Sequence, residues 1–287
     1  FMGGEPNVYN GITDIYIAGR NEGTVGGSQA WGAQYAVVHW KDGDYGPEVI
    51  IVKDENNNPM WHYNTRTNLY IKYVGPTGPT VDVVVPYTFE HEGKIYTAAD
   101  LTEWLLSGKG SFNSITIEEG FDTIARYFAR NTTVNKLILP NSVTTIRQHA
   151  FQYCKLTEVI WPENLVEIGY ESFDDCNLAE LIFPDTLKTI RYNAFSNNPN
   201  LTSVTFNEGL TTIEANAFTK SNLTGEIHIP ASMVNISNNA FANNPNITKI
   251  TLDMYRASAP SGGVVAPTSV SKNQPWGVST SVPIVYL

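Results

Sequence analysis

A phenylalanine recurs six times along this chain at intervals of 22 or 23 residues, at Phe128, Phe151, Phe173, Phe195, Phe218 and Phe241. An isoleucine recurs with the same spacing, at Ile124, Ile146, Ile168, Ile190, Ile213 and Ile236. Self-similarity at this period indicates a solenoid of stacked turns, because no single turn can bury its own apolar edge. Since a solenoid presents a long repeated surface and usually no enclosed pocket, the pattern favours binding over catalysis.

Each repeat opens with a short alternating run, such as Leu137, Ile138 and Leu139, which predicts a β-strand. In four repeats a proline follows and ends the strand, because proline donates no ladder hydrogen bond; these are Pro140, Pro162, Pro184 and Pro230. The recurring Ile and Phe come next, and a polar turn returns the chain to the following strand. A representative copy reads NKLILPNSVTTIRQHAFQYCKL.

This repeat resembles that of the BspA-like leucine-rich repeat family, and the resemblance covers residues 84–287. It implies a leucine-rich-repeat solenoid of the α/β horseshoe class, rich in β-structure with little helix. Proteins of that family are mostly secreted or attached to the cell surface, and they are associated with adhesion to host or neighbouring-cell proteins. The resemblance therefore implies a bacterial, secreted or cell-surface location and a protein-binding role. The N-terminus, FMGGEPNVYN, shows no export signal, which leaves two alternatives: a cytoplasmic protein, or an export signal that lies upstream.

The repeats divide the chain into four expected segments: a small β-rich domain over 1–80, an N-terminal cap over 81–111, repeats over 112–252 and a C-terminal cap over 253–287. The stretches VVVPYTFEHEGKIYTAADL and KNQPWGVSTSVPIVYL are similar to the opening and closing segments of the family. In the first cap, Asp100 and Glu103 predict the start of a short helix that ends at Gly108. In the second, we expect Trp276 to cover the core; the alternative is an exposed ligand platform.

Residues 1–80 lack the repeat and alternate short β-type runs with turn signals, which predicts a small antiparallel β domain. Its aromatic residues form either the core of this domain or, if exposed, a sugar-stacking surface that would bind glycans; they are Trp31, Trp40, Trp61, Tyr63, Tyr70 and Tyr73. Asp42, Asp44 and Asp54 invite a calcium site. The segment KDGDYG lacks the distal glutamate of such sites, so we favour hairpin turns.

The net charge and the motifs present limit the kinds of partner and reaction that we expect. The net charge of −10, without a basic patch, argues against nucleic acid as a partner. No apolar run is long enough to insert into a membrane. The five histidines lack metal-site spacing, and no nucleotide-binding or nucleophile motif occurs, so we expect no enzyme activity, no cofactor and no metal. Cys154 and Cys176 occupy the same repeat position; we favour stacked buried thiols over a disulfide.

Strand alternation predicts which side chains face outward. Leu137 and Leu139 point inward, so Ile138 points to solvent, and the same parity applies to Ile160 and Ile182. We expect these isoleucines to stack in register as one apolar row, followed by Thr205, His228 and Thr251 and bordered by acidic residues at Glu158 and Glu180. The candidate partner-binding residues are therefore Ile138, Ile160, Ile182, Glu158, Glu180 and His228. β-branched residues also suit strands wherever they face, which leaves a purely structural reading open.

Overall fold

A computed structural model describes residues 14–18, 37–41, 49–253 and 276–287 of the chain. The described residues form strands and turns, and none of them forms a helix that could cross a membrane. The chain divides into two compact units, Phe1–Gly75 with Glu90–Ala99, and Pro76–Phe89 with Asp100–Leu287. The segment 90–99, which the sequence places in the N-terminal cap, therefore groups with the first unit.

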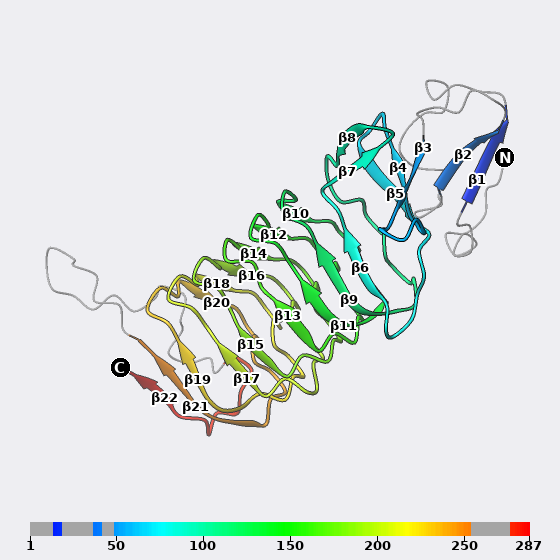
Figure 1. Ribbon diagram of the computed structural model, residues 1–287. Coiled ribbons are helices and arrows are strands. Elements are labelled where there is room, and N and C mark those ends of the chain that lie inside the picture. The colour runs from blue at the N-terminus through cyan, green and yellow to red at the C-terminus, as the bar shows by residue number, and fades with distance from the viewer. Residues whose placement is uncertain (1–13, 19–36, 42–48, 254–275) are drawn as a thin grey trace, which may run out of the picture. The chain divides into compact units, whose positions relative to one another are not determined.

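The first unit contains a three-stranded antiparallel sheet of β3 (Val49–Lys53), β4 (Pro59–Asn64) and β5 (Leu69–Tyr73) (Figure 1). The Asp54 carboxylate closes the β3–β4 turn by accepting hydrogen bonds from the backbone N–H groups of Asn56 and Asn58, so the hairpin interpretation is confirmed there. Asp42 and Asp44 lie outside the described residues. Two further strands, β1 (Asp14–Ala18) and β2 (Val37–Lys41), pair in parallel, unlike the predicted antiparallel arrangement.

The aromatic residues of this sheet form its core. Trp61 and Tyr63 are 1% and 0% exposed, and the rings of Tyr70 and Tyr73 pack against them. The Tyr63 hydroxyl donates a 2.8 Å hydrogen bond to the carbonyl of Thr97. These four aromatics are therefore not available to stack on sugars. Trp31 lies outside the described residues, as does the side chain of Trp40.

The second unit is the predicted solenoid (Figure 1). One ladder of strands contributes one strand per turn: β9 (Ser111–Ile117), β11 (Thr133–Ile138), β13 (Glu158–Ile160), β15 (Glu180–Ile182), β17 (Ser203–Thr205), β19 (Thr224–Ile229) and β21 (Asn246–Leu252). The other is a continuous six-stranded parallel sheet of β10 (Thr123–Ile124), β12 (Thr145–Ile146), β14 (Glu167–Ile168), β16 (Thr189–Ile190), β18 (Thr212–Ile213) and β20 (Asn235–Ile236). The periodic pattern is thus confirmed as stacked β turns.

The recurring Ile and Phe side chains form the interior of this solenoid. All six phenylalanines are fully buried, and so are five of the six isoleucines, Ile236 being 3% exposed. Successive rings from Phe151 to Phe241 stack nearly parallel, with centroids 5.3–5.6 Å apart. Each turn therefore buries its apolar edge against its neighbours, as the period requires.

One further strand pairs at each end of the solenoid. At the start, β6 (Asp82–Val85) pairs with β9. The strands β7 (Thr88–His91) and β8 (Lys94–Thr97) pair with each other in a hairpin that lies mostly in the first unit. At the other end, β22 (Ile284–Tyr286) pairs with β21. Trp276 is buried and its carbonyl accepts a hydrogen bond from Phe241, so the core interpretation of this tryptophan is confirmed.

The helix predicted after Asp100 is wrong, because residues 100–108 form turns. Trp104 has a left-handed φ of 65°, which interrupts any helix. Leu106 and Gly108 donate their backbone hydrogen bonds to Phe128 and Arg130 in the next turn of the solenoid. Because these backbone N–H groups already bond to carbonyls of the neighbouring turn, a helix over residues 100–108 would add no hydrogen bonds for them.

A buried donor recurs three or four residues after each phenylalanine and bonds a carbonyl of the preceding turn. The donors are Thr132, Cys154, Cys176, Asn198, Ser221 and Asn244. Both cysteines are free thiols, as predicted, and burial raises the pKa of Cys176 to about 12 and that of Cys154 well above its ordinary value. The repeat therefore selects a small donor at this position, and cysteine is one of four solutions.

Candidate binding surface

The outward isoleucines lie where strand alternation places them. Ile160 is 43% exposed and Ile182 is 60% exposed, whereas Ile138 is half-buried. Their inward neighbours Leu137 and Leu181 are fully buried. The three isoleucines, defined here as the isoleucine row, lie on a strand face that also exposes Val84 and Val285.

The isoleucine row is not one uninterrupted ladder. Ile138 is directly opposite Ile160 in the parallel pairing of β11 with β13. No strand pairing joins β13 to β15, which begins a separate two-stranded sheet with β17. The predicted in-register stacking is thus confirmed for the first step, whereas no strand pairing supports it for the step to Ile182.

The charged border of the row differs between its two glutamates. Lys136 Nζ lies 2.8 Å from Glu158 Oε1, in the strand pairing that also aligns Ile138 with Ile160. Glu180 has no ion pair among the described residues, so its carboxylate is the uncompensated charge beside Ile182. The predicted acidic border is therefore a neutral pair followed by one negative charge.

His228, the last predicted site residue, lies further along the same ladder in a polar setting. Its Nδ1 lies 3.2 Å from Thr251 Oγ1 and its Nε2 lies 3.0 Å from Asp253 Oδ2. Thr251 is directly opposite His228, as the row predicts, but its predicted exposure to solvent is wrong because it is only 2% exposed. Its hydroxyl bonds both His228 and Glu226, so the side chain is covered by its polar neighbours.

The sequence analysis missed a second feature, a stack of aromatic side chains on the turns. Trp104 stacks on Tyr127 at 4.1 Å, and Tyr127 stacks on His149 at 4.8 Å. Tyr170 continues the stack at the edge of His149, and Tyr192 stacks on Tyr170 at 5.2 Å. The signal was available, because Trp104, Tyr127 and His149 recur with the repeat period. All three have left-handed φ angles of 57–65°, which bulky residues adopt at a cost.

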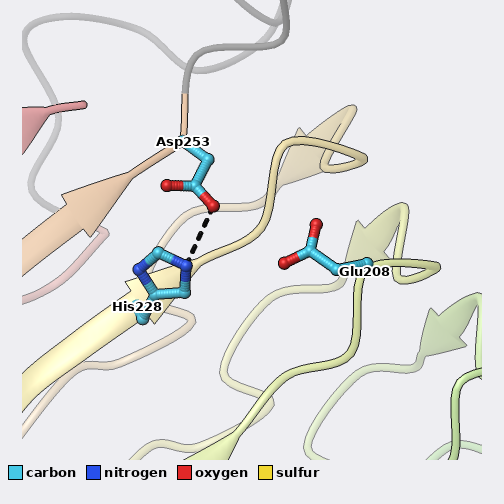
Figure 2. Close-up of side chains that lie close together, drawn as sticks. All are labelled: Glu208, His228 and Asp253. Carbon is cyan, nitrogen blue, oxygen red and sulfur yellow. Dashed lines mark hydrogen bonds and ion pairs between the residues drawn. The ribbon is translucent and has the colours of Figure 1, made fainter.

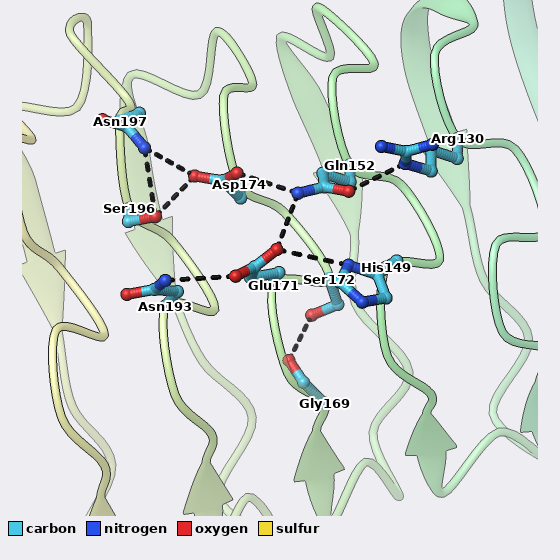
Figure 3. A network of polar contacts seen from close by, with 10 residues as sticks. All are labelled: Arg130, His149, Gln152, Gly169, Glu171, Ser172, Asp174, Asn193, Ser196 and Asn197. Carbon is cyan, nitrogen blue, oxygen red and sulfur yellow. Dashed lines mark hydrogen bonds and ion pairs between the residues drawn. The ribbon is translucent and has the colours of Figure 1, made fainter. Parts of the chain in front are cut away.

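A chain of polar contacts runs beside this stack and crosses several turns (Figure 3). Arg130 donates to Gln152, and the Gln152 amide donates to both Glu171 and Asp174. Asp174 also accepts from Ser196 and Asn197 in the next turn. Adjacent aspartates at 174 and 175 in a polar turn predict a solvated turn, and this is wrong for Asp174, which is 6% exposed. Its carboxylate is buried because the three bonds donated to it by Gln152, Ser196 and Asn197 replace water.

An open groove of about 430 Å³ lies over the second strand ladder. Its lining includes Glu103, Arg126, Arg147, Glu167, Tyr170 and Arg191. Glu103 pairs with Arg126, and Arg191 bridges Glu167 and Glu214 at 2.8 and 2.7 Å. Most of the charges in the groove are therefore paired, and Arg147 is the lining charge without an ion pair among the described residues.

Among the described residues, three side chains approach closely enough to hold a metal ion together: Glu208, His228 and Asp253. They come from three different turns of the solenoid. No local spacing in the sequence indicates such a set, which is why the sequence analysis predicted no metal.

Comparison with known proteins agrees with the fold. A family model described as the BspA type leucine-rich repeat region matches residues 122–248 in six copies. A leucine-rich cell surface protein of Faecalibacterium prausnitzii aligns with a TM-score of 0.57 and 24% identity, over 72% of this chain and 55% of that one. A leucine-rich repeat protein of Eubacterium ventriosum aligns with a TM-score of 0.56 and 18% identity, over 94% of this chain and 63% of that one.

The chain thus spans less than two thirds of the length of either solved structure. At these identities the likeness shows the solenoid fold. No curated protein matches the chain.

Proposed function

Since residues 122–248 belong to the BspA-type leucine-rich repeats, we propose that this chain is a non-enzymatic, protein-binding module that acts at the bacterial cell surface or after secretion. Its partners are host or neighbouring-cell surface or matrix proteins. A solenoid supports this role because each added turn extends one surface without enclosing a pocket. The F. prausnitzii protein of the same fold is described as a cell surface protein, which agrees with the proposed location.

The observation that carries the proposal is the exposure of Ile160 and Ile182. Large aliphatic side chains that are 43% and 60% exposed on a strand face lose contact with water when a partner covers them. The Lys136–Glu158 pair and the free carboxylate of Glu180 border them, so the surface combines an apolar centre with a polar rim. That combination suits a protein partner better than a small ligand.

Glycan binding through the first unit loses its main support, because Trp61, Tyr63, Tyr70 and Tyr73 are buried in the sheet core. A pure spacer role predicts that no substitution on the solenoid surface changes partner binding. One binding experiment therefore distinguishes the proposed protein-binding role from the glycan-binding and spacer alternatives.

The test measures capture of surface and matrix proteins by the immobilised chain, with identification by mass spectrometry and affinity measurement for each captured protein. Ile182→Lys should weaken binding at least tenfold by placing a charge in the apolar centre. Val166→Lys is the matched control, because Val166 is 42% exposed but lies beside β14 in the other strand ladder. Equal binding by both variants and the wild type would reject the isoleucine row as the surface.

A further inference from the structure

The side chains of Glu208, His228 and Asp253 converge at the C-terminal part of the solenoid (Figure 2). Glu208 follows β17, His228 lies within β19, and Asp253 follows β21. One ligand atom from each lies within 4.8 Å of the other two. The stacking of three successive turns therefore gathers one imidazole nitrogen and two carboxylate oxygens at one point.

Thr251 and Glu226 determine which ring nitrogen of His228 faces Glu208 and Asp253. The Thr251 hydroxyl donates a 2.7 Å hydrogen bond to Glu226 Oε1, so its oxygen is left to accept from His228 Nδ1 at 3.2 Å. Lys249 Nζ lies 2.6 Å from Glu226 Oε2 and holds that carboxylate beside the Thr251 hydroxyl. The Thr251 oxygen accepts from Nδ1–H both in the neutral ring that is protonated on Nδ1 and in the imidazolium.

Asp253 Oδ2 lies 3.0 Å from Nε2, a contact that Nε2–H satisfies in the imidazolium and that a bound cation satisfies when the ring is neutral. Glu208 adds a second carboxylate and has no hydrogen bond or ion pair with any residue that the structure describes. The arrangement thus gathers two carboxylates and an imidazole around one point, where a divalent cation would balance their charge.

We propose that Glu208, His228 and Asp253 bind a divalent first-row transition-metal ion, with zinc as the best match, through His228 Nε2 and one carboxylate oxygen of each acid. The imidazole ligand favours zinc over calcium and magnesium, which prefer oxygen alone. Zinc holds its ligands at about 2.0–2.2 Å, so they lie up to about 4 Å apart, and the exposed Glu208 and His228 need to move by less than about 1 Å.

Thr251 and Glu226 act as positioning residues in this site, because a hydrogen bond on the far nitrogen orients a metal-binding histidine. Three protein ligands leave at least one coordination position for water or for a side chain of a partner. The bound ion would also link three successive turns, so it should stabilise the end of the solenoid against unfolding.

Calorimetric titration of the full chain with zinc chloride, after removal of metal by a chelator, tests the site. The wild type should bind one equivalent with a Kd in the micromolar range or tighter. His228→Gln, Asp253→Asn and Glu208→Gln should each weaken binding more than tenfold. Glu163→Gln is the matched control, because Glu163 occupies the turn position of Glu208 two repeats earlier; His91→Gln removes an unrelated imidazole.

Thr251→Val keeps all three ligands and the shape of the side chain, and should weaken zinc binding about 10- to 100-fold through the loss of orientation. Circular dichroism of each metal-free variant checks folding, and Glu208, on an exposed turn, is the variant least able to perturb it. Cobalt should give an absorption spectrum of low-symmetry coordination in the wild type and lose it in His228→Gln. Millimolar zinc affinity in the wild type, or unchanged affinity in His228→Gln and Glu208→Gln, would overturn the proposal.

Discussion

The early and late turns of the solenoid share one interior and differ in two outward positions. At the left-handed position of each turn, the early turns carry Trp104, Tyr127 and His149, whereas the later ones carry Asn193, Asn216 and Asn239. On the outer strand face, the isoleucine row runs from the turn of His149 to the turn of Asn193, and the turns after it carry Thr205 and His228. The interior therefore sets the repeat, and these two positions give each part of the solenoid a different surface.

Bulky residues and asparagine differ in the backbone strain that they cause at the left-handed position. Asparagine tolerates the left-handed region because its short side chain bonds locally, whereas bulky side chains are strained there. The early turns retain three such residues, and their stacked rings, 4.1 and 4.8 Å apart, offset part of that strain. A comparison of substitutions in early and late turns can therefore separate interior stability from surface chemistry.

The largest expected effect comes from the shared interior. Phe195→Ala should lower the free energy of unfolding by about 3–5 kcal/mol, because it removes a buried ring and leaves a cavity. Phe195 stacks on a ring from each neighbouring turn, whereas Phe128 meets Phe151 edge-on at 6.1 Å, so Phe128→Ala should cost less. Chemical denaturation measures both. A loss below about 1 kcal/mol at Phe195 would contradict its burial.

The buried donor position should give a smaller and graded effect. Asn198 donates to three carbonyls, two of which also accept from Ser221 and Asp175, so Asn198→Ala leaves the Phe173 carbonyl unmet and should cost about 1–3 kcal/mol. Cys176 makes one 3.3 Å thiol contact, so Cys176→Ala should cost less.

Thiol titration tests the state of the two cysteines: two thiols should react in denaturant, and both should react slowly in the folded chain. A count of zero would mean a disulfide.

His149 should make the early turns sensitive to acid. Burial is the main cause of its lowered pKa, and Arg130 adds to it, although Glu171 opposes the shift. The unfolded chain therefore binds a proton more readily, so stability should fall as the pH drops below the ordinary value of 6.5. His149→Asn, which adopts the residue of the later turns, should flatten this decline. Thermal melts from pH 7.5 to 5 compare the two; an equally steep decline in the variant would assign it to other groups.

The sequence predicted the interior well because burial repeats with the period. Ile and Phe recur where each turn must be apolar, so counting intervals located the core, the strands and the outward parity of Ile160. It failed where contacts between turns decide the outcome. The break between β13 and β15, the burial of Thr251 and Asp174, and the convergence on His228 depend on side chains that are about 20 residues or more apart. No pattern within a single repeat contains that information.

The smallest expected change in stability belongs to the isoleucine row. Ile160 points outward and is 43% exposed, so Ile160→Lys should change the free energy of unfolding by no more than about 1 kcal/mol. If the row is the partner surface, the same substitution should abolish partner binding or self-association. Val166→Lys supplies the comparison, because Val166 is similarly exposed but lies beside the other strand ladder, and it should leave binding intact. Thermal melts and a binding assay on the same preparations decide the matter. Loss of folding would place Ile160 in the interior, and retained binding would mean that its β-branched side chain serves the strand alone.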